Sequence, residues 1–216
     1  MKKYLVLGIL FVLPILAYMF FASGVNNFGK LSVMHEGVTA PASGAVQFDG
    51  KITILGFPGR DIDQKMTNAL NLNQKIYKRF NGFDDLQFVM LIPPGTEDKV
   101  ADLKLELEKL TDIGNWNFVT LPEDEITTVF NSLGTIHSLN ADLGTDLVFI
   151  VDKESRLRGR EQDDNDLPLY GYDATSVAVI NNKMVDDVKV ILAEYRLSLK
   201  KNNNATGGRD AILKKK

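Results

Sequence analysis

Hydrophobic and polar positions in this chain follow two periods, one typical of buried strands and one typical of amphipathic helices. Nearly continuous apolar runs, bounded by glycine or proline, predict strands; they occupy residues 52–57, 86–92, 116–121 and 147–151. Apolar residues spaced by three and four predict helices; they occupy residues 63–80, 99–110, 123–133 and 175–200. Two shorter strands are expected, at residues 31–34 and, after a tight turn, at residues 156–160.

These elements follow one another in the order β-α-β-α-β-α-β-β-α. Strands joined through helices form parallel pairs, and the last two strands form an antiparallel hairpin closed by a helix. This order predicts a three-layer α/β domain of the thioredoxin-like type over residues 46–200.

The N-terminal segment is apolar on all sides and therefore differs from the rest of the chain. Residues 1–3 include two lysines, and Tyr4–Ala22 is a run of 19 residues without charge. That length is close to the roughly 20 residues that cross a bilayer. We therefore expect a transmembrane helix, an uncleaved anchor rather than a signal peptide, whose apolar region is usually shorter.

The positive-inside bias places Lys2 and Lys3 in the cytoplasm. The globular domain would then lie on the periplasmic side of the inner membrane. Residues 23–45 are small and polar and are interpreted as a linker, and residues 201–216 as a disordered polar tail.

Composition narrows the possible chemistry. The formal net charge is −3 and cysteine is absent. The charge does not indicate a nucleic-acid partner. The absence of cysteine excludes disulfides, thiol catalysis and cysteine-ligated metals.

The stretch Lys51–Thr67 places a strand, a Pro58-Gly59 break and a helix start in direct succession. Amides at a helix start favour anions and thiolates, so chemistry is often found at such a place. This turn offers no thiol, no histidine and no glycine-rich phosphate loop.

Several motifs resemble those of the SCO/SenC family of membrane-anchored thioredoxin-like proteins. Phe48–Phe57 resembles the family's F-x-G-K strand, and Asp63–Thr67 resembles the C-P-K-M-T that closes its C-x-x-x-C-P segment. Phe149–Gly159 resembles the family's strand-turn-strand. The resemblance covers residues 45–200 and implies a thioredoxin-like fold and a role in copper-site assembly for cytochrome oxidase or in thiol-disulfide exchange.

The residues that would carry this activity are missing. The resemblance places the family's two copper-binding cysteines at Gly59 and Asp63 and its histidine near Leu143, with His137 several residues too early. Copper(I) prefers soft thiolate or thioether donors, and disulfide exchange needs a thiolate. We therefore expect no cofactor and no metal at these positions.

The first hypothesis is a non-catalytic accessory or scaffold module that binds another envelope protein, with a link to cytochrome oxidase or copper-protein assembly if that ancestral role survives. The expected contact surface is the turn together with the loop of residues 135–145. The residues singled out for it are Phe57, Pro58, Gly59, Arg60, Asp61, Asp63 and His137.

Two alternatives remain open. One is an enzyme with acid/base chemistry at the same turn, carried by Arg60, Asp61 and Asp63, with His137 joining if its loop folds over the turn. The other is a divalent-cation protein, because acidic loops can supply the oxygen ligands that calcium takes. The candidate cation ligands are Glu161, Asp163, Asp164 and Asp166 in one loop, and Asn140, Asp142 and Asp146 in another.

Overall fold

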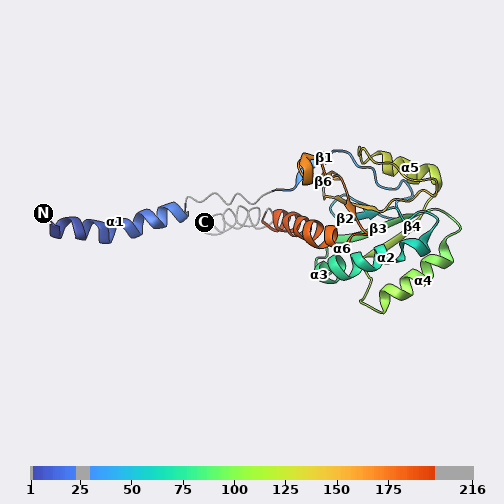
Figure 1. Cartoon of the computed structure of the whole chain (residues 1–216), viewed down its shortest axis with the longest axis horizontal. Coiled ribbons are helices and arrows are strands. Elements are labelled where there is room, and N and C mark those ends of the chain that lie inside the picture. Colours follow the sequence, from blue (N-terminus) through green and yellow to red (C-terminus); the bar gives the residue numbers. More distant parts are fainter. Residues whose placement is uncertain (1, 23–29, 198–216) are drawn as a thin grey trace, which may run out of the picture.

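Strands and helices alternate along the chain much as the hydrophobic pattern predicts (Figure 1). A computed structural model describes residues 2–22 and 30–197. The strands are β1 (Ser32–His35), β2 (Ile52–Gly56), β3 (Leu86–Ile92), β4 (Trp116–Thr120), β5 (Leu147–Val151), β6 (Leu157–Gly159) and β7 (Tyr172–Asp173). The α-helices are α1 (Lys2–Ala22), α2 (Ile62–Leu72), α3 (Lys78–Phe80), α4 (Glu97–Glu108), α5 (Glu123–Asn131) and α6 (Val177–Val179). Two π-helical turns, η1 (Asn73–Tyr77) and η3 (Ile180–Met184), and a 3-10 turn, η2 (Asp164–Asp166), complete the set, and residues 185–197 continue η3 as an α-helix.

One mixed sheet carries all of these strands. Its order is β1-β6-β5-β2-β3-β4, and β7 pairs with β5. β2, β3 and β4 are parallel, whereas β5 is antiparallel to β2 and to β6. A parallel βαβ unit with an antiparallel hairpin beside its first strand is the thioredoxin-like arrangement, so the predicted fold class is confirmed.

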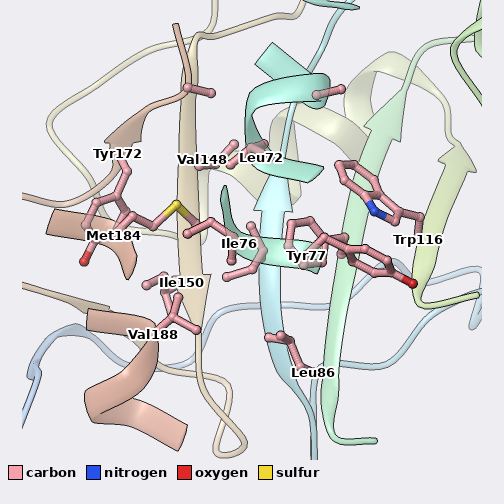
Figure 2. Close-up of a cluster of buried hydrophobic side chains, with 14 of the residues drawn as sticks. Leu72, Ile76, Tyr77, Leu86, Trp116, Val148, Ile150, Tyr172, Met184 and Val188 are labelled. Carbon is pink, nitrogen blue, oxygen red and sulfur yellow. The ribbon is translucent and has the colours of Figure 1, made fainter. Parts of the chain in front are cut away.

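Helices cover both faces of the sheet, which explains why its central strands are apolar throughout. Along β3, Phe88 and Met90 pack with α2 and α4 on one face, and Val89 and Leu91 pack with α5 on the other. Figure 2 shows the first face, where Ile76 and Tyr77 of η1 meet Ile150 of β5 and Trp116 of β4. A strand buried on both faces needs the continuous apolar run that the sequence shows there.

Three features differ from the sequence-based expectation. β5 follows a helix and was expected to pair in parallel, but it lies antiparallel to β2. β7 is only two residues long, too short for a period to reveal it. In the strand after the turn at residues 152–155, arginines alternate with Leu157 and Gly159, a pattern that favours a charged exposed face, but Arg158 on β6 has only 1% of its surface exposed. Its guanidinium donates to Asp152 (2.8 Å), to Glu194 (2.7 Å) and to the carbonyl of Leu31 (3.0 Å from Nε), so the charge is compensated inside the domain.

The N-terminal helix α1 comprises 21 residues. Of its side chains, the structure describes Lys3 and residues 10–19. Within the described part of the chain, no helix is both long enough and apolar enough to cross a membrane, so the predicted span is not confirmed. The predicted linker is described from Lys30 onward, and the predicted tail at residues 201–216 lies outside the described residues.

Candidate functional site

The turn that follows β2 begins from a buried aromatic anchor. The ring of Phe57 is 1% exposed and packs edge-to-face on Phe130 (centroids 5.1 Å apart) and Phe149 (6.2 Å). Edge-to-face packing of this kind stabilises aromatic clusters. Phe57 therefore anchors the turn in the hydrophobic core. It is not part of the exposed contact surface to which the sequence analysis assigned it.

The loop after α5 closes directly over this turn. Thr145 N–H donates to the carbonyl of Phe57 (2.9 Å), and Arg60 N–H donates to the carbonyl of Asp142 (2.9 Å). Within the loop, Asn140 Oδ1 accepts from the N–H groups of Asp142 (3.0 Å) and Gly144 (2.8 Å). The expectation that residues 135–145 adjoin the turn therefore holds for residues 140–145.

Gly59 lies where the two segments come closest. Its φ is +74°, and a Cβ there would lie 2.6 Å from the carbonyl oxygen of Asp142 and 2.8 Å from the Cα of Gly144. These neighbours are backbone atoms, so they cannot rotate out of the way. The position that the SCO/SenC resemblance assigns to a cysteine thus has no space for a side chain.

Charged residues of the turn are paired with the helices on either side. Arg60 forms an ion pair with Glu123 at the start of α5, and Asp63 forms one with Lys99 of α4 (2.8 Å). The hydrogen bond with Asp63 raises the pKa of Lys99 above its ordinary value. Asp61 is the residue before α2, but its side chain caps no helical N–H. These acids and the arginine are thus salt-bridged or half-exposed rather than gathered into a catalytic set.

A small apolar cavity of about 30 Å³ lies beside the turn. Pro58, Met90, Leu103 and Val148 contribute to its walls. At its rim Lys65 pairs with Asp146 (2.5 Å), which lowers the pKa of that carboxyl. The volume is room for about one water-sized group, so the cavity is a packing feature of the site and not a substrate pocket.

His137 lies apart from the groups around Gly59. It is exposed, and its ring neighbour among the described residues is Tyr170 (centroids 6.4 Å apart). Partial burial lowers the pKa of its imidazole. The loop folds over the turn through residues 140–145, but no described contact joins His137 to Arg60, Asp61 or Asp63.

Neither acidic loop forms a cation site. In the first loop, Lys183 pairs with Asp163 and with Asp164 (2.7 Å), so their charge is already neutralised by the protein. In the second loop, Asn140 is occupied by backbone N–H groups and Asp146 by Lys65. Across the described ranges, no three His, Asp or Glu side chains are placed to hold a metal ion.

Sequence reasoning missed the residues that lock the turn. Gly144 is one of them: a Cβ on it would lie 2.8 Å from the carbonyl oxygen of Pro58. Lys99 and Glu123 are the others, since they neutralise the turn's charges from separate helices. A glycine in a loop and acids in a first helical turn are common features, so the sequence carried no specific signal for these contacts.

No family model matches this chain, and no curated protein matches it. Similar solved structures include copper-bound ScoI of Arabidopsis thaliana, at 17% identity and TM-score 0.40, covering 66% of this chain and 86% of that one. They also include the soluble domain of Sco1 from Bacillus subtilis, at 16% identity and TM-score 0.36, covering 66% of this chain and 79% of that one.

The thioredoxin domain of a thiol-disulfide oxidoreductase from Bacteroides vulgatus is similar to the same extent. It shares 16% identity with a TM-score of 0.40, over 63% of this chain and 79% of that domain. No functional conclusion is drawn from likenesses at this level.

Proposed function

We propose that this chain is a non-catalytic thioredoxin-like protein that is anchored in a membrane and binds another envelope protein at the turn after β2. The observation that supports this most is the closure of Gly59. Backbone atoms of the loop occupy the space that a reactive side chain would need. The turn therefore has a fixed neighbour in the loop and its own charge, but it carries no thiol.

The accessible part of this surface is small and polar. Pro58, Arg60 and Asp61 are half-buried and Asp63 is exposed, and both flanking ion pairs have exposed partners. Exposed ion pairs contribute little to stability but set electrostatic complementarity with a partner. We infer that a partner recognises this pattern of one arginine and two acids, held rigid by the loop.

Crosslinking in native membranes tests the partner. A photoreactive amino acid at Asp61 is expected to capture a defined envelope protein, and the same group at Glu108 on α4 serves as the control. Capture at Asp61 should fall by about tenfold when Arg60 is changed to glutamate, because a charge reversal at a rim weakens complementary association.

The identity of the captured protein decides between pathways. Subunits of cytochrome oxidase or copper-handling proteins would place the chain as an accessory factor in their assembly. Equal capture at both positions, or capture unchanged by Arg60→Glu, would refute a contact surface at this turn.

The membrane anchor is supported by the sequence of α1. Its uncharged run, Tyr4–Ala22, extends on both sides of the side chains that the structure describes. The 19 uncharged residues of this run are close to the roughly 20 that cross a bilayer. Within α1, Phe11 is 64% and Leu16 60% exposed, so apolar surface there lacks a cover from the domain.

Alkaline extraction of membranes tests the anchor. We expect the full-length chain to stay in the membrane fraction, and a double variant with Leu10→Lys and Leu16→Lys to be released, because each central lysine costs roughly 3 kcal/mol of insertion. Mass spectrometry of the N-terminus separates an anchor from a signal peptide. Release of the unchanged full-length chain, or a mature N-terminus after Ala22, contradicts the anchor.

A further inference from the structure

The sheet has an open edge at β4 within the part of the chain that the structure describes. β4 pairs with β3 on one side only. Leu121 N–H donates to the carbonyl of Ile92 (3.0 Å), so alternate backbone groups of this segment, counted from Leu121, face β3. The N–H and C=O groups of Phe118 and Thr120 therefore face outward, where another strand can pair with them.

The two edges of the sheet differ in their protection. At the β1 edge the register shifts between Val33 and His35, an irregularity of the kind that discourages further pairing. The five residues of β4 pair with β3 without a shift and contain no proline and no charge. Natural edge strands usually carry such protective features, so their absence from β4 needs an explanation.

A groove of about 420 Å³ runs along β4. Its floor includes Trp116 and Phe118, whose rings stack with centroids 5.7 Å apart and planes 12° apart. Lys104 of α4 also lines the groove, with Nζ 5.3 Å from the centre of the Phe118 ring. The indole Nε1 of Trp116 is buried and has no hydrogen-bond partner. The groove thus offers an aromatic floor and a cation.

The positive charge in this groove favours a bound segment that is acidic. Lys104 is the only charged residue among those that line the groove, and it forms no ion pair with a described residue. A second copy paired about Phe118 would bring two Lys104 side chains together, and like charges across such a contact are unfavourable. The chain's own residues 201–216 are basic and are disfavoured for the same reason.

We propose that β4 binds an extended, acidic segment of a partner protein, which adds a strand to the sheet and places a carboxylate on Lys104. Main-chain hydrogen bonds supply affinity in this mode of recognition, and the side chains along the groove supply specificity. This inference does not depend on the turn after β2, so either surface can be present without the other.

A fluorescence titration tests the proposal, because Trp116 is the chain's only tryptophan and lies in the groove. The full-length chain, purified in a mild detergent, is titrated with the capped peptide T-V-E-V-E-V-T and with its counterpart T-V-K-V-K-V-T. We expect a saturable change with the acidic peptide and affinity at least about tenfold weaker for the basic one.

Two variants locate the contact. Lys104→Glu should invert the preference between the two peptides, whereas Lys109→Glu, outside the groove, should leave it unchanged. Thr120→Pro removes an outward N–H but leaves the hydrogen bonds with β3 in place. It should weaken the binding of the acidic peptide by at least about tenfold. A peptide N-methylated at alternate residues gives the same test without changing the protein.

The proposal is overturned if neither peptide gives a saturable change up to about 1 mM or if both bind equally. It is also overturned if N-methylation of the peptide in both alternate patterns has no effect. A concentration-dependent dimer in sedimentation that Thr120→Pro abolishes would assign the edge to a second copy instead.

Discussion

Replacing Gly59 with alanine is expected to lower the free energy of unfolding by about 3 kcal/mol, measured by urea denaturation of the full-length chain. Two effects add. A non-glycine residue at a φ of +74° costs roughly 1–2 kcal/mol, and forcing a Cβ into packed backbone costs roughly 1–3 kcal/mol more. Gly59→Cys should cost at least as much, because its side chain is larger.

Two other glycines serve as matched controls. Gly50 has a φ of +75° but nothing within 4 Å of its Cβ position, so Gly50→Ala should show the backbone cost alone. Gly82 has neither a positive φ nor a neighbour within 4 Å, and Gly82→Ala should be nearly neutral. A Gly59→Ala variant that costs no more than Gly50→Ala would show that the loop yields at Gly59.

Cysteines at positions 59 and 63 test the proposed lack of catalysis. A Gly59→Cys, Asp63→Cys double variant restores both thiols of the C-x-x-x-C segment in sequence. It should unfold more readily than the parent and gain no tight copper(I) site, because the loop occupies the first thiol's place. A double variant with parental stability that binds copper(I) tightly would contradict the closed site.

Replacing Arg158 with methionine is expected to lower the free energy of unfolding by about 3–5 kcal/mol, because it removes one partner of a buried ion pair. Asp152 is fully buried, and its carboxylate would keep only Arg156 as a charged partner. Urea denaturation at neutral pH measures the loss. Lys189→Met, which removes an exposed ion pair with Asp186, is the control and should cost less than about 1 kcal/mol.

The stability that Arg158→Met removes should depend on pH. Burial raises the pKa of Asp152, but hydrogen bonds from Arg156 and Arg158 outweigh burial and hold the pKa below its ordinary value. A lowered pKa adds stability above the unfolded value, about 3.9, and that stability is lost as the pH falls through the folded value. The difference between parent and Arg158→Met should therefore shrink below about pH 4. A difference constant down to pH 2 would exclude Asp152 as its source.

Local patterns predicted most of the fold. Residues 86–92 form a strand at the predicted bounds, because a strand buried on both faces must be apolar throughout. The Pro58-Gly59 break was visible because proline fixes φ and lacks an N–H, whereas glycine readily adopts a positive φ. In such segments the local preference and the tertiary structure agree, so the sequence alone suffices.

Contacts between distant segments were not predictable in this way. Arg158 alternates with Leu157 and Gly159, a pattern that favours a solvated charged face. Its partners stand 6, 36 and 127 residues away, and only the folded chain brings them together. The closure of Gly59 likewise depends on a loop more than 80 residues further along, for which no pattern near Gly59 gives a signal.

The contacts of the Arg158 guanidinium also limit how far the domain can be truncated at either end. It bonds Leu31 just before the first strand and Glu194 near the end of the last described helix, so a single side chain joins entry and exit. A fragment that starts after Leu31 or stops before Glu194 would leave part of that cation without its partners. Trimming either end of the domain past these residues therefore removes a partner of the same side chain, so a loss at one end also loosens the contact with the other.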